Sequence, residues 1–279
     1  MKTRRIGNVE VSAIGLGEMP MSIPGRPDRA RSIATIHAAL DAGITLIDTA
    51  DAYTSPEDGV GHGELLVAEA LKGRSENVLV ATKGGHIFRP GGPWDRNGDP
   101  DYLKNAARES LKRLGVEAIG LYQFHRPDPT VPYEDSVGAL RDLLDEGIIL
   151  MAGISNADIE QIKTADRVLG GRLVSVQNQF SPVYRSSLDE LNYCVENEIA
   201  FIPWSPLGGI GRTDDAQPAF TEVADAHGVS PQQVAIAWEL SLGHTVVPIP
   251  GASRPESIID SAKGPDLVLT EDELAKLSA

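Results

Sequence analysis

The chain has 279 residues and a formal net charge of −15, and 41% of its residues are hydrophobic while 23% are charged. This is the composition of a folded globular protein, and its acidity argues against a general affinity for nucleic acid or anionic membranes. The longest apolar stretch, Ile148 to Ala152, is far shorter than the roughly 20 residues of a membrane span. The basic start of the chain precedes no apolar segment, so no secretory signal is expected. Cys194 is the only cysteine, which excludes an intrachain disulfide and fits a cytoplasmic location.

A repeated pattern runs along the chain, in which a helical period ends at a glycine and a β-branched segment follows. Glycine just past a helix end supplies the left-handed cap. The clearest helix is capped by Asp99, has Pro100 in its first turn and ends at Gly115. The other predicted helices end at Gly43, Gly73, Gly147 and Gly170, with one more over 188–198. The predicted strands cover 13–18, 44–48, 78–83, 119–125, 148–155, 173–180, 199–206 and 245–251.

Eight strands that alternate with amphipathic helices, without a change in composition, predict an α/β fold of the closed (β/α)8 TIM-barrel type. We expect one domain over 1–279. Gly7 and Asn8 lie between two short strand-like runs and predict a β-hairpin before the barrel. The Gly/Pro-rich segment 89–100 is expected to be a functional loop rather than a domain boundary.

Four acid/base side chains fall at the ends of three neighbouring predicted strands: Asp48 and Tyr53 after the second, Lys83 after the third, and His125 after the fourth. In this fold the chemistry lies at the carboxyl ends of the strands. A lysine ammonium beside a tyrosine favours the phenolate, which makes the phenol a better proton donor. Each residue alone has a structural explanation, such as a helix cap for Asp48 or a packed aromatic for Tyr53. Their convergence on one rim favours a catalytic group.

Two other kinds of site are not supported by the sequence. The remaining histidines and Cys194 show no metal-ligand spacing, so no metal is expected. No G-x-G-x-x-G connects a strand to a helix, since the glycines of 207–211 have a different spacing. Any cofactor must therefore bind in the pocket of the barrel itself.

Several motifs in register resemble the aldo-keto reductase family. They are "GLGEM", "IDTADAY", "ATKGG", "LYQFHRPDP", "GISN", "VQNQFSP", "PWSPLGG" and "VPIPGASRPE", and they span nearly the whole chain. The resemblance implies reversible, nicotinamide-dependent reduction of a carbonyl. Tyr53 would be the general acid, supported by Asp48, Lys83 and His125. The last two motifs are similar to a bacterial branch with a short C-terminal segment that includes pyridoxal reductases.

The resemblance also implies how the nicotinamide is held. Ser155, Asn156 and Gln177 would hydrogen-bond its carboxamide, and Trp204 would stack on its ring. Family members often have tyrosine at that position, but tryptophan keeps the flat face that stacking needs. The alternative for Trp204 is a packed aromatic of the barrel core.

The rest of the cofactor is assigned in the same way. Ser205 and Leu207 would border the pyrophosphate, and Ser253 and Arg254 would contact the adenosine 2′-phosphate of NADPH. Many members have a second basic residue where this chain has Ser253, so NADH remains an alternative. Arg254 alone could equally be a solvated surface residue.

An apolar wall for a small-molecule carbonyl substrate is expected from the loops after the first and third strands. It would consist of Met21, His86, Ile87, Phe88 and Trp94. The predicted function is NADPH-dependent reduction of an aldehyde or ketone. The alternative is a cofactor-retaining, redox-sensing binding subunit with little turnover. A barrel hydrolase or isomerase would need a metal cluster or paired carboxylates. The physiological substrate and the oligomeric state are not readable from the sequence.

Overall fold

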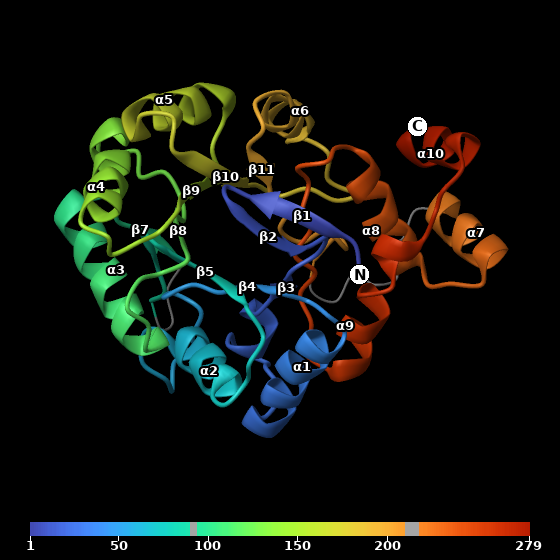
Figure 1. Cartoon of the computed structure of the whole chain (residues 1–279), viewed down its shortest axis with the longest axis horizontal. Helices are drawn as coiled ribbons and strands as arrows, with labels where there is room; N and C mark the ends of the chain where they lie inside the picture. The colour runs from blue at the N-terminus through green and yellow to red at the C-terminus, as the bar shows by residue number, and fades with distance from the viewer. Residues whose placement is uncertain (90–93, 210–217) are drawn as a thin grey trace.

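A curved sheet of seven parallel strands forms the centre of the molecule (Figure 1). The computed structural model describes residues 1–89, 94–209 and 218–279. Neighbouring strands follow the order β11-β10-β9-β8-β5-β4-β3. Their bounds are β3 Leu16–Gly17, β4 Leu46–Asp48, β5 Leu79–Gly84, β8 Leu121–Phe124, β9 Ala152–Ser155, β10 Leu173–Gln177 and β11 Ala200–Phe201.

The eighth predicted strand closes the barrel through single bridges instead of a continuous ladder. Val246 pairs with Phe201, and Gly251 pairs with Gly17. Two prolines explain the interruption, because Pro248 and Pro250 accept hydrogen bonds from strand β3 and its approach but have no N–H to donate in return. The predicted (β/α)8 barrel is confirmed, and its eighth strand is a connection shaped by proline.

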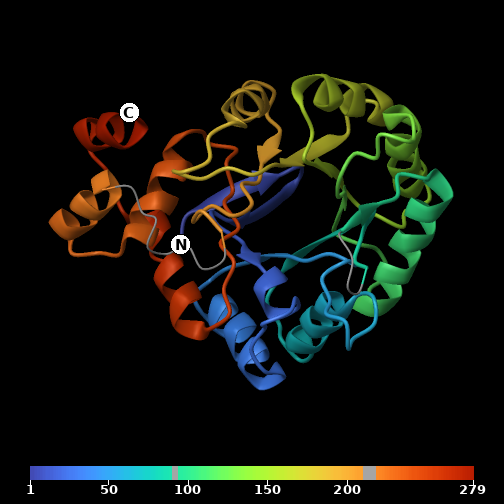
Figure 2. The same ribbon diagram turned by 180° about the vertical axis from the view of Figure 1, so that it is seen from behind.

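Helices form an outer ring around the sheet (Figure 2). Asp99 caps α3 at its N-terminus and Gly115 ends it in the left-handed region, as predicted. The bounds are α1 Arg29–Asp41, α2 His62–Leu71, α3 Pro100–Leu114, α4 Tyr133–Asp145, α5 Ile159–Leu169, α6 Leu188–Glu196, α7 Pro218–His227, α8 Pro231–Ser241, α9 Pro255–Ser261 and α10 Glu271–Ser278, with short 3-10 turns η1 Met19–Met21 and η2 Gly264–Asp266.

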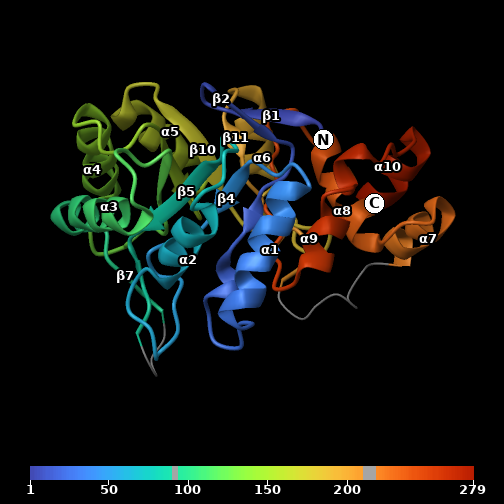
Figure 3. The same cartoon turned by 60° about the horizontal axis from the view of Figure 1, so that its bottom comes forward.

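The predicted N-terminal hairpin covers one end of the barrel. Strands β1 (Thr3–Ile6) and β2 (Val9–Ser12) pair antiparallel across a turn in which Gly7 has a φ of 55°. The buried Ile6 and Val11 pack against inward-facing side chains of the barrel strands. The hairpin therefore seals the end opposite to the strand termini that carry the polar residues (Figure 3).

A second, unpredicted hairpin lies at that other end. Strand β6 (His86–Ile87) pairs antiparallel with β7 (Asp95–Arg96). Only β7 lies within the segment 89–100 that was predicted as a functional loop, and residues 90–93 of that segment lie outside the described residues. In Figure 3 the hairpin extends away from the barrel on the side opposite to β1 and β2. No described helix is both long and apolar enough to cross a membrane.

One buried carboxyl group stands out in α8. Glu239 has no exposed surface, and neither of its carboxyl oxygens has a hydrogen-bond partner among the described residues. Burial raises its pKa well above the ordinary value. The group is therefore neutral in the folded protein, and its burial is unfavourable at neutral pH because the unfolded chain carries it as a carboxylate.

Replacing this carboxyl by an alkyl group should stabilise the fold. We expect Glu239→Leu to increase the free energy of unfolding at pH 8 by about 1–3 kcal/mol, the usual cost of an unsatisfied buried polar group. Urea unfolding of both proteins measures the difference. The exposed Glu117→Leu is the control and should change little. A loss of stability in Glu239→Leu would show that the carboxyl has a favourable partner.

Candidate active site

A cavity of about 800 Å³ opens at the carboxyl ends of the strands. Three of the predicted catalytic residues line it, namely Asp48, Tyr53 and His125. All eight residues assigned to the cofactor line it as well: Ser155, Asn156, Gln177, Trp204, Ser205, Leu207, Ser253 and Arg254. The structure thus brings together side chains that are up to 206 positions apart in the sequence, Asp48 and Arg254.

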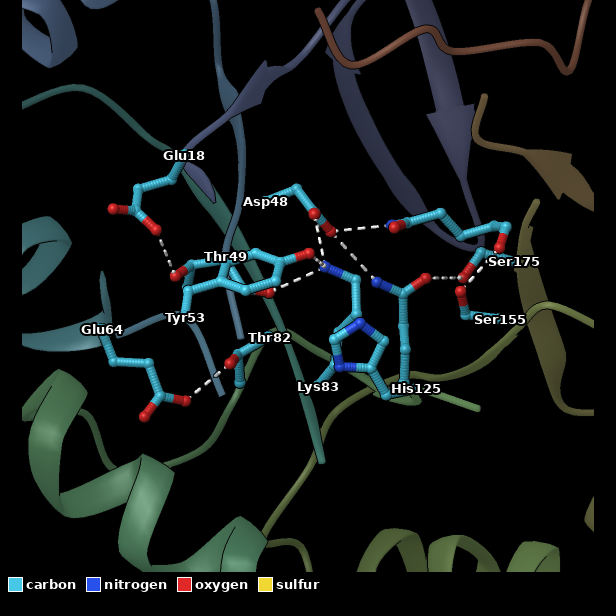
Figure 4. Close-up of polar contacts among 12 residues, drawn as sticks. Glu18, Asp48, Thr49, Tyr53, Glu64, Thr82, Lys83, His125, Ser155 and Ser175 are labelled. Atoms are coloured by element: carbon cyan, nitrogen blue, oxygen red, sulfur yellow. Dashed lines mark hydrogen bonds and ion pairs between the residues drawn. The ribbon is translucent and has the colours of Figure 1, made fainter. Parts of the chain in front are cut away.

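Lys83 lies beneath the floor of this cavity, fully buried. Its ammonium group donates to Asp48 Oδ1 at 2.5 Å, to the carbonyl oxygen of Thr49 at 2.9 Å and to Tyr53 Oη at 3.2 Å. All three N–H donors of the ammonium therefore have acceptors. Figure 4 shows Lys83 between Asp48 and Tyr53, with the ring of His125 close by.

Strand alternation explains why these side chains meet. Successive side chains of a strand point to opposite faces, so every second residue faces the barrel interior. Leu46 and Leu79 belong to the interior cluster, which places Asp48 and Lys83 on the same inner face two and four residues later. The register of β4 against β5 aligns the two strands directly, with Asp48 opposite Ala81.

Two glutamines hold the second oxygen of Asp48. Gln177 Nε2 donates to Oδ2 at 2.8 Å, and Gln123 Nε2 donates at 3.2 Å. Gln177 was assigned to the nicotinamide; in the structure its amide also supports the carboxylate. Gln123 was missed, although it lies two residues before His125 and strand alternation could have placed it on the inner face.

The electrostatics of Tyr53 differ from the expectation in one respect. Burial raises the pKa of the phenol above its ordinary value, and Lys83 opposes this without reversing it. For Lys83 itself, burial would lower the pKa, but Asp48 and Tyr53 together raise it above the ordinary value. Desolvation dominates at Tyr53 because the lysine charge is shared with a carboxylate 2.5 Å away. The phenol is therefore protonated, and the lysine charged, at neutral pH.

His125 is held as a neutral imidazole. Burial, and secondarily Lys83 and His86, lower its pKa well below the ordinary value. Its ring lies edge-on to that of Tyr53, with 5.8 Å between the centroids. A neutral imidazole has one N–H to donate, so the pair can present two hydrogen-bond donors to one carbonyl oxygen.

Two residues on the cavity wall adopt a conformation that is rare for side chains with a Cβ. Asn156 has a φ of 59° and Ser205 a φ of 54°. Asn156 Nδ2 donates to the carbonyl oxygen of His125 at 3.0 Å and to Ser155 Oγ at 2.9 Å. Such left-handed residues occur where the surroundings fix them, often at functional sites.

The far end of the cavity carries positive charge. Ser253, Arg254 and Ser257 line it from α9 and its approach, and Arg31 lines it from α1. Arg254 Nε donates to Ser257 Oγ at 2.8 Å, and the two terminal nitrogens of its guanidinium have no partner among the described residues. Arg31 was missed in the sequence, where only Ser253 stood beside Arg254. It supplies a second cation from a segment 223 positions away.

The substrate wall differs from the prediction. His86 and Trp94 line the cavity and stack with 4.6 Å between ring centroids. Met21 does not line it, because its side chain is fully buried in the core; Met19, at the start of the same 3-10 turn, takes its place. Ile87 and Phe88 do not line the cavity, although Phe88 packs edge-to-face on Trp94.

A buried acid next to the catalytic group was also missed. Glu18 is fully buried and accepts a hydrogen bond from Thr49 Oγ1 at 2.9 Å and another from Ser22 Oγ. Ser22 Oγ lies 2.9 Å from Nδ1 of His62, which is partly exposed. Gly63 makes room for this carboxyl, since a Cβ there would lie 2.4 Å from Glu18 Oε2. Burial raises the pKa of Glu18 to about 7.

Comparison with known proteins identifies the class. Residues 13–279 match the family model described as "Aldo/keto reductase family", so the chain belongs to this family. It is 33% identical over 281 residues to an uncharacterized oxidoreductase of Schizosaccharomyces pombe, covering 99% of this chain and 88% of the relative. It is 35% identical over 277 residues to a 6-dehydroglucose reductase of Novosphingobium aromaticivorans, covering 93% and 89%.

Solved structures agree. An aldo-keto reductase from Klebsiella pneumoniae in complex with NADPH superimposes with a TM-score of 0.83 at 29% identity, covering 99% of this chain and 94% of that chain. The glycerol dehydrogenase of Gluconobacter oxydans gives a TM-score of 0.85 at 27% identity, with the same coverage. The protein is therefore an oxidoreductase that uses a nicotinamide cofactor. No group of metal-ligating side chains occurs in the described part of the chain.

The buried Glu18 should make stability depend on pH. Its folded pKa of about 7 lies above the ordinary 4.5, so the folded state binds the proton more tightly. The stabilising contribution of the protonated Glu18 is fully present below about pH 4.5 and is lost as the pH rises to about 7. This loss lowers the free energy of unfolding by on the order of 3 kcal/mol. Glu18→Gln removes this titration.

Urea unfolding of the wild-type protein and of Glu18→Gln, from pH 5 to pH 8.5, measures the effect. The difference between the two free energies of unfolding, variant minus wild type, should increase as the pH rises and become constant above about pH 7. Glu57→Gln, at an exposed acid, is the control. A constant difference over the whole range would show that Glu18 does not change its charge there.

Proposed function

We propose that the protein reduces an aldehyde or ketone with NADPH, and that Tyr53 is the general acid. The observation that carries this is the contact between Tyr53 Oη and Lys83 Nζ at 3.2 Å, beside the neutral His125, at the floor of the cavity. Only 8% of the Tyr53 surface is exposed, so its hydroxyl meets a bound molecule rather than bulk water.

The cavity fits a dinucleotide in volume and in chemistry. Its volume lies within the usual range for small-molecule sites, roughly 300–1,000 Å³. At one end the half-buried Trp204 offers a flat face, and its Nε1 is buried without a hydrogen-bond partner among the described residues. Asn156 and Gln177 supply amides next to it, and two arginines line the other end. When bound, the reduced nicotinamide supplies the hydride.

Proton transfer falls to this chain's own residues. As the carbonyl carbon gains a hydride, the carbonyl oxygen gains the proton of Tyr53 Oη, and an alcohol forms. Lys83 stabilises the phenolate that remains, since a cation 3.2 Å away favours the charged form. His125, being neutral, donates a hydrogen bond to the carbonyl oxygen without competing as an acid.

Asp48 keeps the lysine in position. Its Oδ1 binds the ammonium and its Oδ2 is fixed by two glutamine amides, so the carboxylate cannot rotate towards the phenol. A buried charge pair of this kind needs all its remaining hydrogen-bonding positions satisfied. The arrangement orients Lys83 towards Tyr53 before substrate arrives.

The choice of NADPH rests on the arginines at the far end. Arg254 and Arg31 line the same part of the cavity, and no ion pair to a described carboxylate occupies either guanidinium. A 2′-phosphate is the group that distinguishes NADPH from NADH, and guanidinium groups bind phosphate oxygens well. A cofactor-retaining sensing subunit with little turnover is not favoured. The complete set of Asp48, Tyr53, Lys83 and His125 instead fits an enzyme that converts its substrate.

Removal of the phenolic hydroxyl should abolish most of the activity. Tyr53→Phe keeps the buried ring, so the fold should persist, while kcat for a simple aldehyde should fall by at least about 10²-fold. NADPH oxidation followed by absorbance measures this, and NADPH binding should change little. The exposed Tyr184→Phe is the matched control. Turnover close to that of the wild type in Tyr53→Phe would exclude Tyr53 as the acid.

The arginines that line the cavity should determine cofactor selectivity. Arg254→Ala and Arg31→Ala should each weaken NADPH binding by roughly 10- to 150-fold, the value of a charge-assisted hydrogen bond of about 1.5–3 kcal/mol. NADH binding should stay within about threefold, since NADH has no 2′-phosphate for either guanidinium to contact.

Titration of both cofactors, followed by tryptophan fluorescence, decides this. Arg29→Ala is the matched control, because Arg29 lies on the same helix as Arg31 and pairs with Glu69 instead of lining the cavity. Equal weakening of NADPH and NADH would show that these arginines do not recognise the 2′-phosphate.

A further inference from the structure

Arg126 lies directly after His125, at the point where β8 opens into the cavity. Its half-buried guanidinium lines the cavity together with Tyr53, His86 and Trp94. Its hydrogen-bond partner Asn156 also donates to the carbonyl oxygen of His125, so Arg126 lies beside the reacting group. The proposed mechanism does not use it.

Most hydrogen-bond donors of this guanidinium have no protein partner among the described residues. Nη2 donates to Asn156 Oδ1 at 3.3 Å, and Nε is buried with no partner among the described residues. Arg113, another partly buried arginine, shows the usual arrangement: its Nε lies 2.6 Å from the fully buried carboxylate of Glu64. Arg126 has no comparable ion pair in the described part of the chain, although a buried arginine normally has one.

The surroundings add positive rather than negative charge. Burial, and then Arg96, lower the pKa of Arg126. The neighbouring His86 is neutral, since burial and then the two arginines Arg126 and Arg96 lower its pKa to about 4.

The nearby acids are already engaged. Asp48 is bound by Lys83 and by two glutamines. Asp95 pairs with Arg89, and Asp128 accepts hydrogen bonds from the backbone N–H of Gly98 and from Thr130. None of these carboxylates can move to Arg126 without breaking its present bonds. The guanidinium is thus available to a group that enters the cavity.

We propose that Arg126 is a specificity-determining residue that binds a carboxylate on the carbonyl substrate. This rests on the proposed function, since the carbonyl is placed by Tyr53 and His125. A guanidinium forms two parallel hydrogen bonds to a carboxylate through its two terminal nitrogens, and among the described residues Nη1 has no partner while Nη2 makes only the 3.3 Å bond to Asn156. The stacked rings of His86 and Trp94 line the same cavity as Arg126 and Tyr53 and offer a flat apolar surface to the rest of the substrate. The substrate class is therefore an aldehyde or ketone that also carries a carboxylate.

Two benzaldehydes of similar shape test this directly. 4-Carboxybenzaldehyde has the anionic group and 4-nitrobenzaldehyde has a neutral group of the same outline. The wild-type protein should reduce the carboxylate with the higher kcat/KM. Arg126→Gln should lower kcat/KM for the carboxylate by roughly 10- to 150-fold, mainly through KM, and change that for the nitro compound by no more than about threefold. Arg126→Lys should show a smaller loss, since lysine keeps the positive charge but cannot form the two parallel hydrogen bonds of a guanidinium.

Arg96→Gln is the control for the general electric field of this region, because Arg96 is exposed and lies outside the cavity lining. It should leave the preference unchanged. An absence of preference in the wild type would overturn the proposal. So would an equal fall for both substrates in Arg126→Gln, which would show that Arg126 acts through Asn156 on the cofactor.

A binding measurement separates this proposal from the proposed function. Benzoate and benzamide, titrated into the protein with its cofactor, report recognition of the anion without turnover. Benzoate should bind at least about tenfold more tightly, and Arg126→Gln should remove the difference. If neither aldehyde is reduced but benzoate is preferred through Arg126, the reductase assignment fails while the anion site stands. If benzoate and benzamide bind equally, the anion site fails.

Discussion

The ion pair between Asp48 and Lys83 is the interaction on which the rest of the site depends. Removing two charges from water costs several kcal/mol each, and their attraction compensates only when every remaining hydrogen-bonding position is filled. Here the ammonium has three acceptors, and the carboxylate receives amides from two further strands. Four strands must therefore be in register for this pair to be stable, and the same register brings Tyr53 to the cavity floor.

Positive charge is placed locally against a strongly acidic background. The net charge of −15 repels anions at long range, so anionic groups must be recognised by contacts inside the cavity. Arg31, Arg254 and Arg126 all line the cavity, and we propose that they supply such contacts. Within a partly buried cavity these cations are screened less than on the surface, which makes each of them more selective.

The sequence predicted what strand ends and helix caps determine. The strand positions of Asp48, Lys83 and His125 followed from alternating glycine-capped helices and β-branched runs, because that pattern fixes where each strand opens onto the rim. The short seventh and eighth strands were overestimated, since prolines at 203, 248 and 250 remove backbone donors that a hydrophobic pattern does not reveal. Met21 was predicted to line the pocket, whereas Met19 does so, because the direction of side chains in a short 3-10 turn cannot be read from the sequence.

Residues whose roles depend on contacts between distant segments were beyond the sequence pattern. Glu18 is the last residue of the first predicted strand, and nothing in its local sequence marks it as buried; the space left by Gly63 and the donors Ser22 and Thr49 explain its burial. Arg31 reads as one charge on the solvated face of a helix, and its place beside Arg254 follows from the packing of α1 against α9. Burial of a polar residue depends on all the residues that surround it in the fold, and the local hydrophobic periodicity of the sequence does not reveal it.

Asn156 joins the reacting part of the site to the part that we propose selects the substrate. Its Nδ2 donates to the carbonyl oxygen of His125, and its Oδ1 accepts a hydrogen bond from the Arg126 guanidinium. A left-handed backbone at this position directs both ends of the amide towards the strand that carries the two residues. Asparagine tolerates this conformation better than most residues with a Cβ, which reduces the strain. The positions of His125 and Arg126 are thus both linked to a single side chain, so a substrate of the kind that we propose would have its carbonyl and its carboxylate bound at a fixed separation.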